Sequence, residues 1–268
     1  MRIRSRFVAG MLLTLIVCFM SFTLCWAEGE NKDTPRIGII SAMDNEISLL
    51  LDSAEEEEVV TIGGVDYHVG TLCGQDVVIC KSGIGKVLGA AGVTAMLNNF
   101  DITEVLFTGI AGGVGDKTHV LDMVIATDLV QHDFGEILAD GFKWTKGYVG
   151  DGYYPCSEEL VDQAYSAAVS IIGEDHVFKG TIATGDQFVA SEEYVNWLQD
   201  KFDAIACEME GAAIALVCMQ YDTPFVVIRA MSDKADGLAN KTYNDMGDRA
   251  AELSSSIIMK MLGDTPSA

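Results

Sequence analysis

The chain has 268 residues, of which 49% are hydrophobic and 21% charged, and 40 acidic residues outnumber 17 basic ones. The resulting net charge of -23 repels phosphate backbones and anionic membrane surfaces, so we expect no nucleic-acid partner. The apolar fraction is too high for a disordered acidic chain, and the length suits one large domain.

The N-terminal segment differs from the rest of the chain. Arg2, Arg4 and Arg6 precede an uncharged apolar run that ends near Trp26, and polar residues follow Ala27. This pattern is typical of a signal peptide, although the run is also long enough to remain as a membrane anchor. We therefore predict that residues 1–27 are a signal peptide or an N-terminal anchor. The rest of the chain would then be periplasmic, extracellular or held at the outer face of a membrane.

After this segment, short apolar runs predict strands and amphipathic runs predict helices. In chain order we predict a strand at 37–41, a helix at 45–53, antiparallel strands at 59–62, 67–72 and 77–80, a helix at 86–98, strands at 104–108 and 122–128, a loop at 133–156, a helix at 158–172, a strand at 179–184, a helix at 192–201, a strand at 204–207, a helix at 209–221, a strand at 225–231 and a helix at 243–262. Strands separated by helices favour an α/β fold with a mixed, mostly parallel twisted sheet flanked by helices. We find no internal repeat or linker, so we predict one domain.

Five cysteines follow residue 27, and their odd number and lack of C-x-x-C spacing disfavour a zinc site or a disulfide framework. We expect them to be free, buried thiols. Two glycine runs, at residues 82–86 and 109–113, match neither G-x-G-x-x-G nor the P-loop, which disfavours dinucleotide and nucleoside triphosphate binding. These runs are either loops that approach a ligand or plain strand-to-helix turns.

Three acids lie near the ends of different predicted strands: Glu46, Glu210 and Asp233. Ligands of open α/β sheets bind beyond the carboxyl ends of strands, and Arg229 adds one cation at such an end. A pocket with several carboxylates fits sugar hydroxyls and glycosidic chemistry. Each acid alone could instead be a surface charge or stabilise a helix N-terminus. Histidines are scarce and only His132 is placed for a site, so we expect no metal and no cofactor.

Six motifs occur in order along the chain: Ile37-Gly-Ile-Ile-x-Ala-Met-x-x-Glu46, Lys81-Ser-Gly-Ile-Gly-Lys-Val87, Thr108-Gly-x-Ala-Gly-Gly113, Ala183-Thr-Gly-Asp-Gln-Phe188, Glu208-Met-Glu210 and Arg229-Ala-x-Ser-Asp233. With them the chain resembles the 5'-methylthioadenosine/S-adenosylhomocysteine nucleosidases of the nucleoside phosphorylase superfamily. The resemblance implies one catalytic domain at residues 36–263.

The resemblance also implies a reaction, in which water cleaves the N-glycosidic bond between adenine and a 5'-thio-substituted ribose. Glu46 would deprotonate the water, Glu210 would hold the ribose hydroxyls, and Asp233 would donate a proton to adenine N7. Other implied substrate contacts come from Ile84, Gly112, Phe188 (stacked on adenine), Val189 (through its backbone), Met209 (beside the sugar), Arg229, Ser232 (assisting the acid) and Tyr243. The implied assembly is a homodimer whose partner lends apolar residues to the 5'-pocket.

The chain departs from the family pattern at two places, and two alternative functions remain open. Ile110 stands where the family often has a serine that helps hold the water, and residues 133–156 do not match the stretch that shapes the 5'-pocket. A phosphorylase would need cationic donors for phosphate, whereas of the three arginines beyond residue 27 only Arg229 lies at a strand end. A non-catalytic exported nucleoside-binding protein would need Glu210 and Asp233 but not Glu46.

Overall fold

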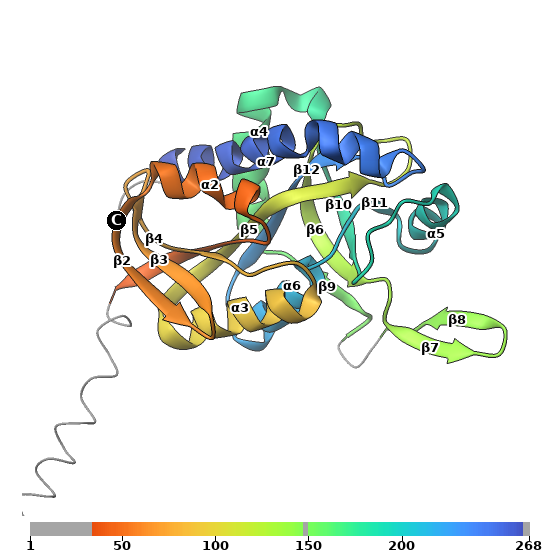
Figure 1. The fold of residues 1–268 in the computed structure, drawn as a ribbon, viewed down its shortest axis with the longest axis horizontal. Helices are drawn as coiled ribbons and strands as arrows, with labels where there is room; N and C mark the ends of the chain where they lie inside the picture. The colour runs from red at the N-terminus through yellow and green to blue at the C-terminus, as the bar shows by residue number, and fades with distance from the viewer. Residues whose placement is uncertain (1–33, 147–149, 265–268) are drawn as a thin grey trace, which may run out of the picture. The chain divides into compact units, whose positions relative to one another are not determined.

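A ten-stranded mixed sheet lies at the centre of the computed structural model, which describes residues 34–146 and 150–264 (Figure 1). The segment predicted to be a signal peptide or anchor lies outside the described residues. In chain order the elements are β1 (Pro35–Ser41), α2 (Asp44–Ser53), β2 (Glu55–Ile62), β3 (Val65–Leu72), β4 (Gln75–Lys81), α3 (Lys86–Asn99), β5 (Asp101–Gly113), β6 (Met123–Gln131), β7 (Gly135–Leu138), β8 (Gly141–Trp144), β9 (Tyr153–Pro155), α4 (Glu158–Ile172), a 3-10 turn (Glu174–His176), β10 (Val177–Thr184), α5 (Glu192–Phe202), β11 (Ala204–Glu208), α6 (Gly211–Gln220), β12 (Phe225–Asp233) and α7 (Ala239–Asp264).

The strands follow the order β11-β10-β6-β12-β5-β1-β4-β3-β2, with β9 on β6. The centre, β12-β5-β1-β4, is parallel, and so is the β6-β10-β11 group. Antiparallel pairing joins β12 to β6 and forms the β2-β3-β4 meander, which the sequence predicts. The last residues of β5 also pair with β11, so the five strands β5, β12, β6, β10 and β11 form a closed ring of paired strands. The predicted α/β class with a mixed sheet is confirmed.

Helices cover the sheet from both sides (Figure 1). Helices α2, α4 and α7 lie on one side, where α7 packs on β5 and β12, and α3 and α6 pack together on the other. Because both faces are covered, every residue of β12 is buried. Polar residues in such a strand have no solvent-facing side, so Arg229, Ser232 and Asp233 must find partners inside the protein.

Several elements differ from the sequence predictions, among them β2, which begins at Glu55 rather than at residue 59, and α7, which begins at Ala239 rather than at residue 243. Residues 133–156 are not only loop, because β7 and β8 form a hairpin around Ala139-Asp140 and β9 pairs with β6. Gly141 has a φ of 123°, which a glycine adopts without strain at such a turn. Strand β5 runs to Gly113 rather than to residue 108, because its end gains partners in β11 and β12. Helix α6 begins at Gly211 rather than at Met209.

The five cysteines of the described residues are free thiols, of which four are buried and Cys73 is exposed. In the same part of the chain, no helix combines the length and the apolar character needed to cross a membrane.

Candidate active site

A cavity of about 310 Å³ opens beyond the carboxyl ends of β1, β5, β11 and β12. It brings together ten of the eleven residues that the sequence singled out. These are Glu46, Ile84, Gly112, Phe188, Val189, Met209, Glu210, Ser232, Asp233 and Tyr243. Arg229, the eleventh, lies beneath the cavity and is 1% exposed.

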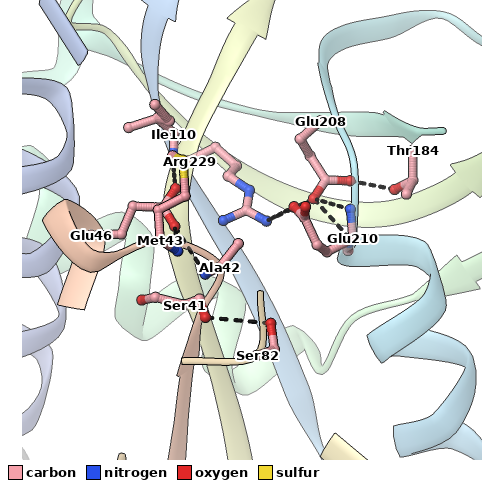
Figure 2. A network of polar contacts seen from close by, with 12 residues as sticks. Ser41, Ala42, Met43, Glu46, Ser82, Ile110, Thr184, Glu208, Glu210 and Arg229 are labelled. Atoms are coloured by element: carbon pink, nitrogen blue, oxygen red, sulfur yellow. Dashed lines mark hydrogen bonds and ion pairs between the residues drawn. The ribbon is translucent and has the colours of Figure 1, made fainter. Parts of the chain in front are cut away.

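Glu46 projects from the first turn of α2 and is 2% exposed. Its Oε2 accepts hydrogen bonds from the backbone N–H groups of Ala42 and Met43, each 2.9 Å long, and its Oε1 accepts one of 2.9 Å from Ile110 N (Figure 2). Burial raises the pKa of Glu46 above its usual value, and Arg229 and the three N–H groups oppose that rise. Glu46 is thus a fixed, poorly hydrated carboxylate, which suits a general base.

Ile110 contributes to this site through its backbone. Its N–H holds Glu46, while its side chain is 8% exposed and lines the cavity. The structure therefore has no hydroxyl group at position 110, where the family often has a serine.

Glu46 Oε1 and Arg229 Nη1 face each other above the backbone of Gly109, and we call the space between these two atoms the gap. A Cβ atom on Gly109 would lie 2.5 Å from Glu46 Oε1 and closer still to Arg229 Nη1. Within the described residues, Nη1 and Nε of Arg229 are buried without a hydrogen-bond partner. A buried donor and a buried acceptor that face one gap are suitable partners for an ordered water molecule.

Arg229 pairs with two carboxylates on its other side (Figure 2). Its Nη2 lies 2.6 Å from Glu208 Oε2 and 3.8 Å from Glu210 Oε2, and its guanidinium stacks on Phe107, 3.9 Å from the ring centroid. Burial and the Glu208 charge raise the pKa of Glu210 to about 8, against the lowering effect of Arg229.

Glu208 is a structural partner that was not among the site residues predicted from the sequence. It accepts hydrogen bonds from Thr184 Oγ1, from Glu210 N and, at 2.7 Å, from Gly211 N. These bonds to two successive N–H groups hold residues 209 and 210 outside α6, so that Met209 and Glu210 reach the cavity. The sequence signal was the Glu-x-Glu spacing, which predicts two acids on the same side of an extended segment.

Asp233 ends β12 and is 2% exposed. Its Oδ1 accepts a 2.7 Å hydrogen bond from Ala235 N, and its Oδ2 accepts one of 2.8 Å from Ser232 Oγ. Burial raises the pKa of Asp233 above its usual value, and these two bonds oppose the rise. A carboxyl group with a raised pKa can hold a proton and donate it to a ligand.

Aromatic side chains form part of the cavity wall. Phe188 is 48% exposed, and its ring meets that of Tyr243 edge-on with centroids 6.1 Å apart. The Tyr243 hydroxyl lies 3.7 Å from Met43 Sδ. A flat apolar ligand such as a purine can stack on Phe188 there.

Three charged residues connect the loops around the cavity. Lys86 Nζ lies 2.5 Å from Asp133 Oδ1, Lys86 N donates to Asp186 Oδ1 at 2.8 Å, and Asp186 N donates to Asp133 Oδ2 at 2.9 Å. Burial alone would raise the pKa of Asp133, but its bonds to Lys86 and Asp186 bring it below the usual value. The neighbouring Gly85 N donates to Glu210 Oε1 at 2.7 Å. This Lys86–Asp133–Asp186 network therefore links the loop before α3 to the loop that carries Phe188.

His132 does not line the cavity. It is fully buried beneath Gly185, and its Nδ1 lies 3.0 Å from the Tyr194 hydroxyl. Burial lowers the pKa of His132, so it is a neutral packing residue. Among the described residues, no group of three or more His, Cys, Asp or Glu side chains is arranged to hold a metal ion.

Comparison with known proteins places this site in a family. The family model for the phosphorylase superfamily matches residues 36–263. The 5'-methylthioadenosine/S-adenosylhomocysteine nucleosidase of Bacillus thuringiensis (strain Al Hakam) is 37% identical over 239 residues, which cover 85% of this chain and 98% of that protein. The chain belongs to the 5'-methylthioadenosine/S-adenosylhomocysteine nucleosidase family of the phosphorylase superfamily.

Solved structures of this nucleosidase family share the fold. The nucleosidase of Neisseria meningitidis, solved in complex with methylthio-immucillin-A, matches with a TM-score of 0.79 and 35% identity, over 86% of this chain and 99% of that one. A futalosine hydrolase of Helicobacter pylori matches with a TM-score of 0.77 and 33% identity, over 86% of this chain and 98% of that one.

Proposed function

We propose that this nucleosidase-family protein hydrolyses the N-glycosidic bond of 5'-thio-substituted adenine nucleosides, releasing adenine and a 5-thio-substituted ribose. The observation that carries the proposal is one cavity lined by two kinds of buried carboxyl group. Glu46 faces, across the gap, an Arg229 nitrogen that has no hydrogen-bond partner in the described part of the chain, and Asp233 is held by Ser232 and Ala235 N. The first arrangement suits a base acting on water, and the second suits an acid.

Water is activated at the gap above Gly109. Arg229 Nη1 donates a hydrogen bond to the water oxygen, and Glu46 accepts one of its protons as the oxygen attacks C1'. The backbone bonds that fix Glu46 leave its carboxylate in one orientation, so the attack needs little reorganisation.

Adenine leaves from the other side of the sugar. As the C1'–N9 bond breaks, its electron pair moves into the purine, and Asp233 donates a proton to N7, so that neutral adenine departs. Phe188 stacks on the base, and Val189 offers backbone groups to it. Ile84 and Tyr243 complete the wall.

The ribose lies between these two ends. Glu210 accepts hydrogen bonds from the ribose hydroxyls, and Met209 packs beside the ribose ring. Gly112 has no side chain, so the backbone there can lie close to the ligand. Positive charge develops on the ribose in the oxocarbenium-like transition state, and the surrounding carboxylates stabilise it.

The cavity wall favours hydrolysis over phosphorolysis. Its charged lining residues among those described are all acids, and the Arg229 guanidinium is already paired with Glu208. A phosphate dianion would meet repulsion there rather than a bidentate cationic site. Glu46 also has no use in a protein that only binds nucleosides.

We further propose a homodimer. Support comes from exposed large apolar side chains next to the cavity, at Ile84, Val87 and Leu88, and on the β7–β8 hairpin, at Ile137 and Phe142. A second copy would remove these surfaces from water. Sedimentation of a fully active monomer would contradict this assembly.

Export is a separate proposal, which rests on the sequence of residues 1–27 alone. The N-terminus of the protein isolated from its native cells should begin near residue 28, or the full-length protein should be found at the outer face of a membrane. Recovery of the full-length chain from the cytosol would contradict it.

The deciding experiment is to incubate pure protein with 5'-methylthioadenosine, adenosine, inosine and futalosine, each with and without phosphate, and to chromatograph the products. From the adenine nucleosides we expect adenine and a free ribose derivative, at a rate independent of phosphate. Turnover of adenine nucleosides should exceed turnover of inosine by on the order of 10²-fold, because the 6-oxo group of inosine leaves a buried polar group without its hydrogen bond. A sugar 1-phosphate, or equal turnover of inosine, would refute the proposal.

A further inference from the structure

A buried histidine that the proposed reaction does not use lies beneath the loop that would hold the base. We call residues 185–191 the base loop, which follows β10 and carries Phe188 and Val189. A Cβ atom on Gly185 would lie 2.3 Å from both Cε1 and Nε2 of His132. The edge of the His132 ring therefore packs against the first residue of the base loop.

The same ring contacts the helix that follows the base loop. His132 Nδ1 lies 3.0 Å from the hydroxyl of Tyr194 in the first turn of α5, which Ser191 caps by accepting a hydrogen bond from Tyr194 N. The backbone N–H of His132 also donates to Thr184 O at 2.9 Å, directly before Gly185. His132 thus supports the base loop at both of its ends.

The protonation state of His132 is restricted by its second ring nitrogen. Nε2 is buried and has no hydrogen-bond partner within the part of the chain that the structure describes. A neutral ring that donates from Nδ1 to Tyr194 leaves only an acceptor unpaired, whereas a protonated ring carries an N–H group on both nitrogens. A charged donor at Nε2 would then be buried against Gly185 without an acceptor, which is costly. Protonation is therefore compatible only with a movement of Gly185 that opens Nε2 to water.

Four titratable groups act on His132, from the adjacent Asp133, from Lys86 on α3, from Glu208 on β11 and from Tyr194 on α5. Burial has the largest effect and lowers the pKa of His132, the carboxylates of Asp133 and Glu208 raise it, and Lys86 lowers it further. Burial also raises the pKa of Tyr194, so its hydroxyl is uncharged. The surroundings therefore favour the neutral ring as long as the base loop stays in place.

We propose that His132 is a positioning residue that makes binding of the base depend on pH. The neutral ring supports the base loop, and protonation displaces Gly185, so that Phe188 and Val189 move away from the base. The inference rests on the proposed function, which places adenine against these two residues. The step adds one solvent proton to the ring and breaks no covalent bond. Because the base binds better to the neutral form, bound ligand must in turn oppose protonation of His132.

The test measures by calorimetry the affinity of formycin A, a C-nucleoside analogue of adenosine, as the pH falls from about 7.5 to about 5, across the usual pKa of histidine. His132→Gln keeps a carboxamide beneath Gly185 but cannot be protonated. The acids that line the cavity are present in both proteins, so the comparison isolates His132. The dissociation constant should rise roughly tenfold more in the wild-type protein than in His132→Gln, which corresponds to about 1.4 kcal/mol.

Tyr194→Phe is a second variant, which removes a single hydroxyl group. It should move the rise to lower pH, because the protonated ring then has no partner at Nδ1 either. His68→Gln is the matched control and should follow the wild-type protein, since it removes a partly exposed histidine that pairs with Glu56 on the β2–β3 strand pair. The same pH dependence in wild-type protein and His132→Gln would overturn the proposal, and so would an unshifted curve in Tyr194→Phe.

Failure of formycin A to bind at any pH would refute the proposed function instead. Hydrogen exchange of the ligand-free protein then still tests the support by His132. The protection factors of the amides in residues 185–191 should fall as the pH is lowered in the wild-type protein and stay constant in His132→Gln. Constant protection in the wild-type protein would show that His132 does not position the base loop.

Discussion

Replacing Gly109 by alanine would place a methyl group in the gap between Glu46 and Arg229. The strand backbone accepts this change, because Gly109 does not adopt a left-handed conformation. The new Cβ would lie 2.5 Å from Glu46 Oε1 and 2.9 Å from its Cδ, whereas ordinary Cβ contacts are 3.4–4 Å. The carboxylate and the guanidinium must therefore each move by roughly 1 Å, or the strand must shift, since such contacts are not tolerated in packed interiors.

This displacement sets the expected magnitude. A shift of about 1 Å in a catalytic group lowers turnover on the order of 10²-fold, and expelling the water could extend the loss to roughly 10⁴-fold. The stability cost should be smaller, about 1–3 kcal/mol, which is typical of overpacking. Binding of the base and sugar should survive, because Phe188, Asp233 and Glu210 are not displaced.

The assay measures adenine release for turnover, and the affinity of a C-nucleoside analogue, whose C–C bond cannot be hydrolysed, for binding. Gly180→Ala is the matched control, because its Cβ would lie 2.8 Å from Ile205 Cδ1, away from the cavity. The control should lose stability and keep its turnover. Wild-type turnover in Gly109→Ala would refute the reasoning, because the gap would then not hold the attacking water.

Three further predictions follow from the same contacts. Glu46→Gln keeps the side chain's size but cannot accept a proton, so turnover should fall by roughly 10²–10⁴-fold while analogue affinity stays within a few-fold; near-normal hydrolysis would remove Glu46 from the mechanism. The pKa of Glu210 is about 8 in the folded protein against a usual 4.5, so the folded state binds the extra proton and its stabilisation is lost as pH rises through 8. The melting temperature of the ligand-free protein should therefore fall between pH 5 and 9, and less steeply in Glu210→Gln; parallel curves for the two proteins would contradict this assignment. Lys86→Met should remove the ion-pair partner of Asp133, which keeps only its hydrogen bond from Asp186 N, and should loosen the loop that carries Phe188. We expect KM for 5'-methylthioadenosine to rise by roughly tenfold with kcat changed less, whereas Lys86→Arg should recover much of the loss. An unchanged KM in Lys86→Met would show that this network does not position the loop.

The sequence by itself determined the order and type of most elements. Alternating apolar and amphipathic runs predicted the strands from 37–41 to 225–231 and the helices between them. Each element buries one or both of its faces, and that burial sets the spacing of its apolar residues and the length of the run in the sequence. The acids at positions 46, 210 and 233 could be expected to meet, since the ends of strands in such a sheet lie along the same edge. Polar residues directly after apolar strands were the local sequence signal that predicted the site.

Tertiary structure decided the features that depend on partners distant in the sequence. Strand β5 extends to Gly113 only because β11 and β12 supply hydrogen-bond partners, and α6 starts late because Glu208 captures the N–H groups of residues 210 and 211. Arg229 looked like a substrate contact at a strand end, yet the fold buries it beneath the cavity against Glu208. A buried charge must be paired where it lies, and which carboxylate pairs with it depends on strand order and register, which no local pattern in the sequence encodes.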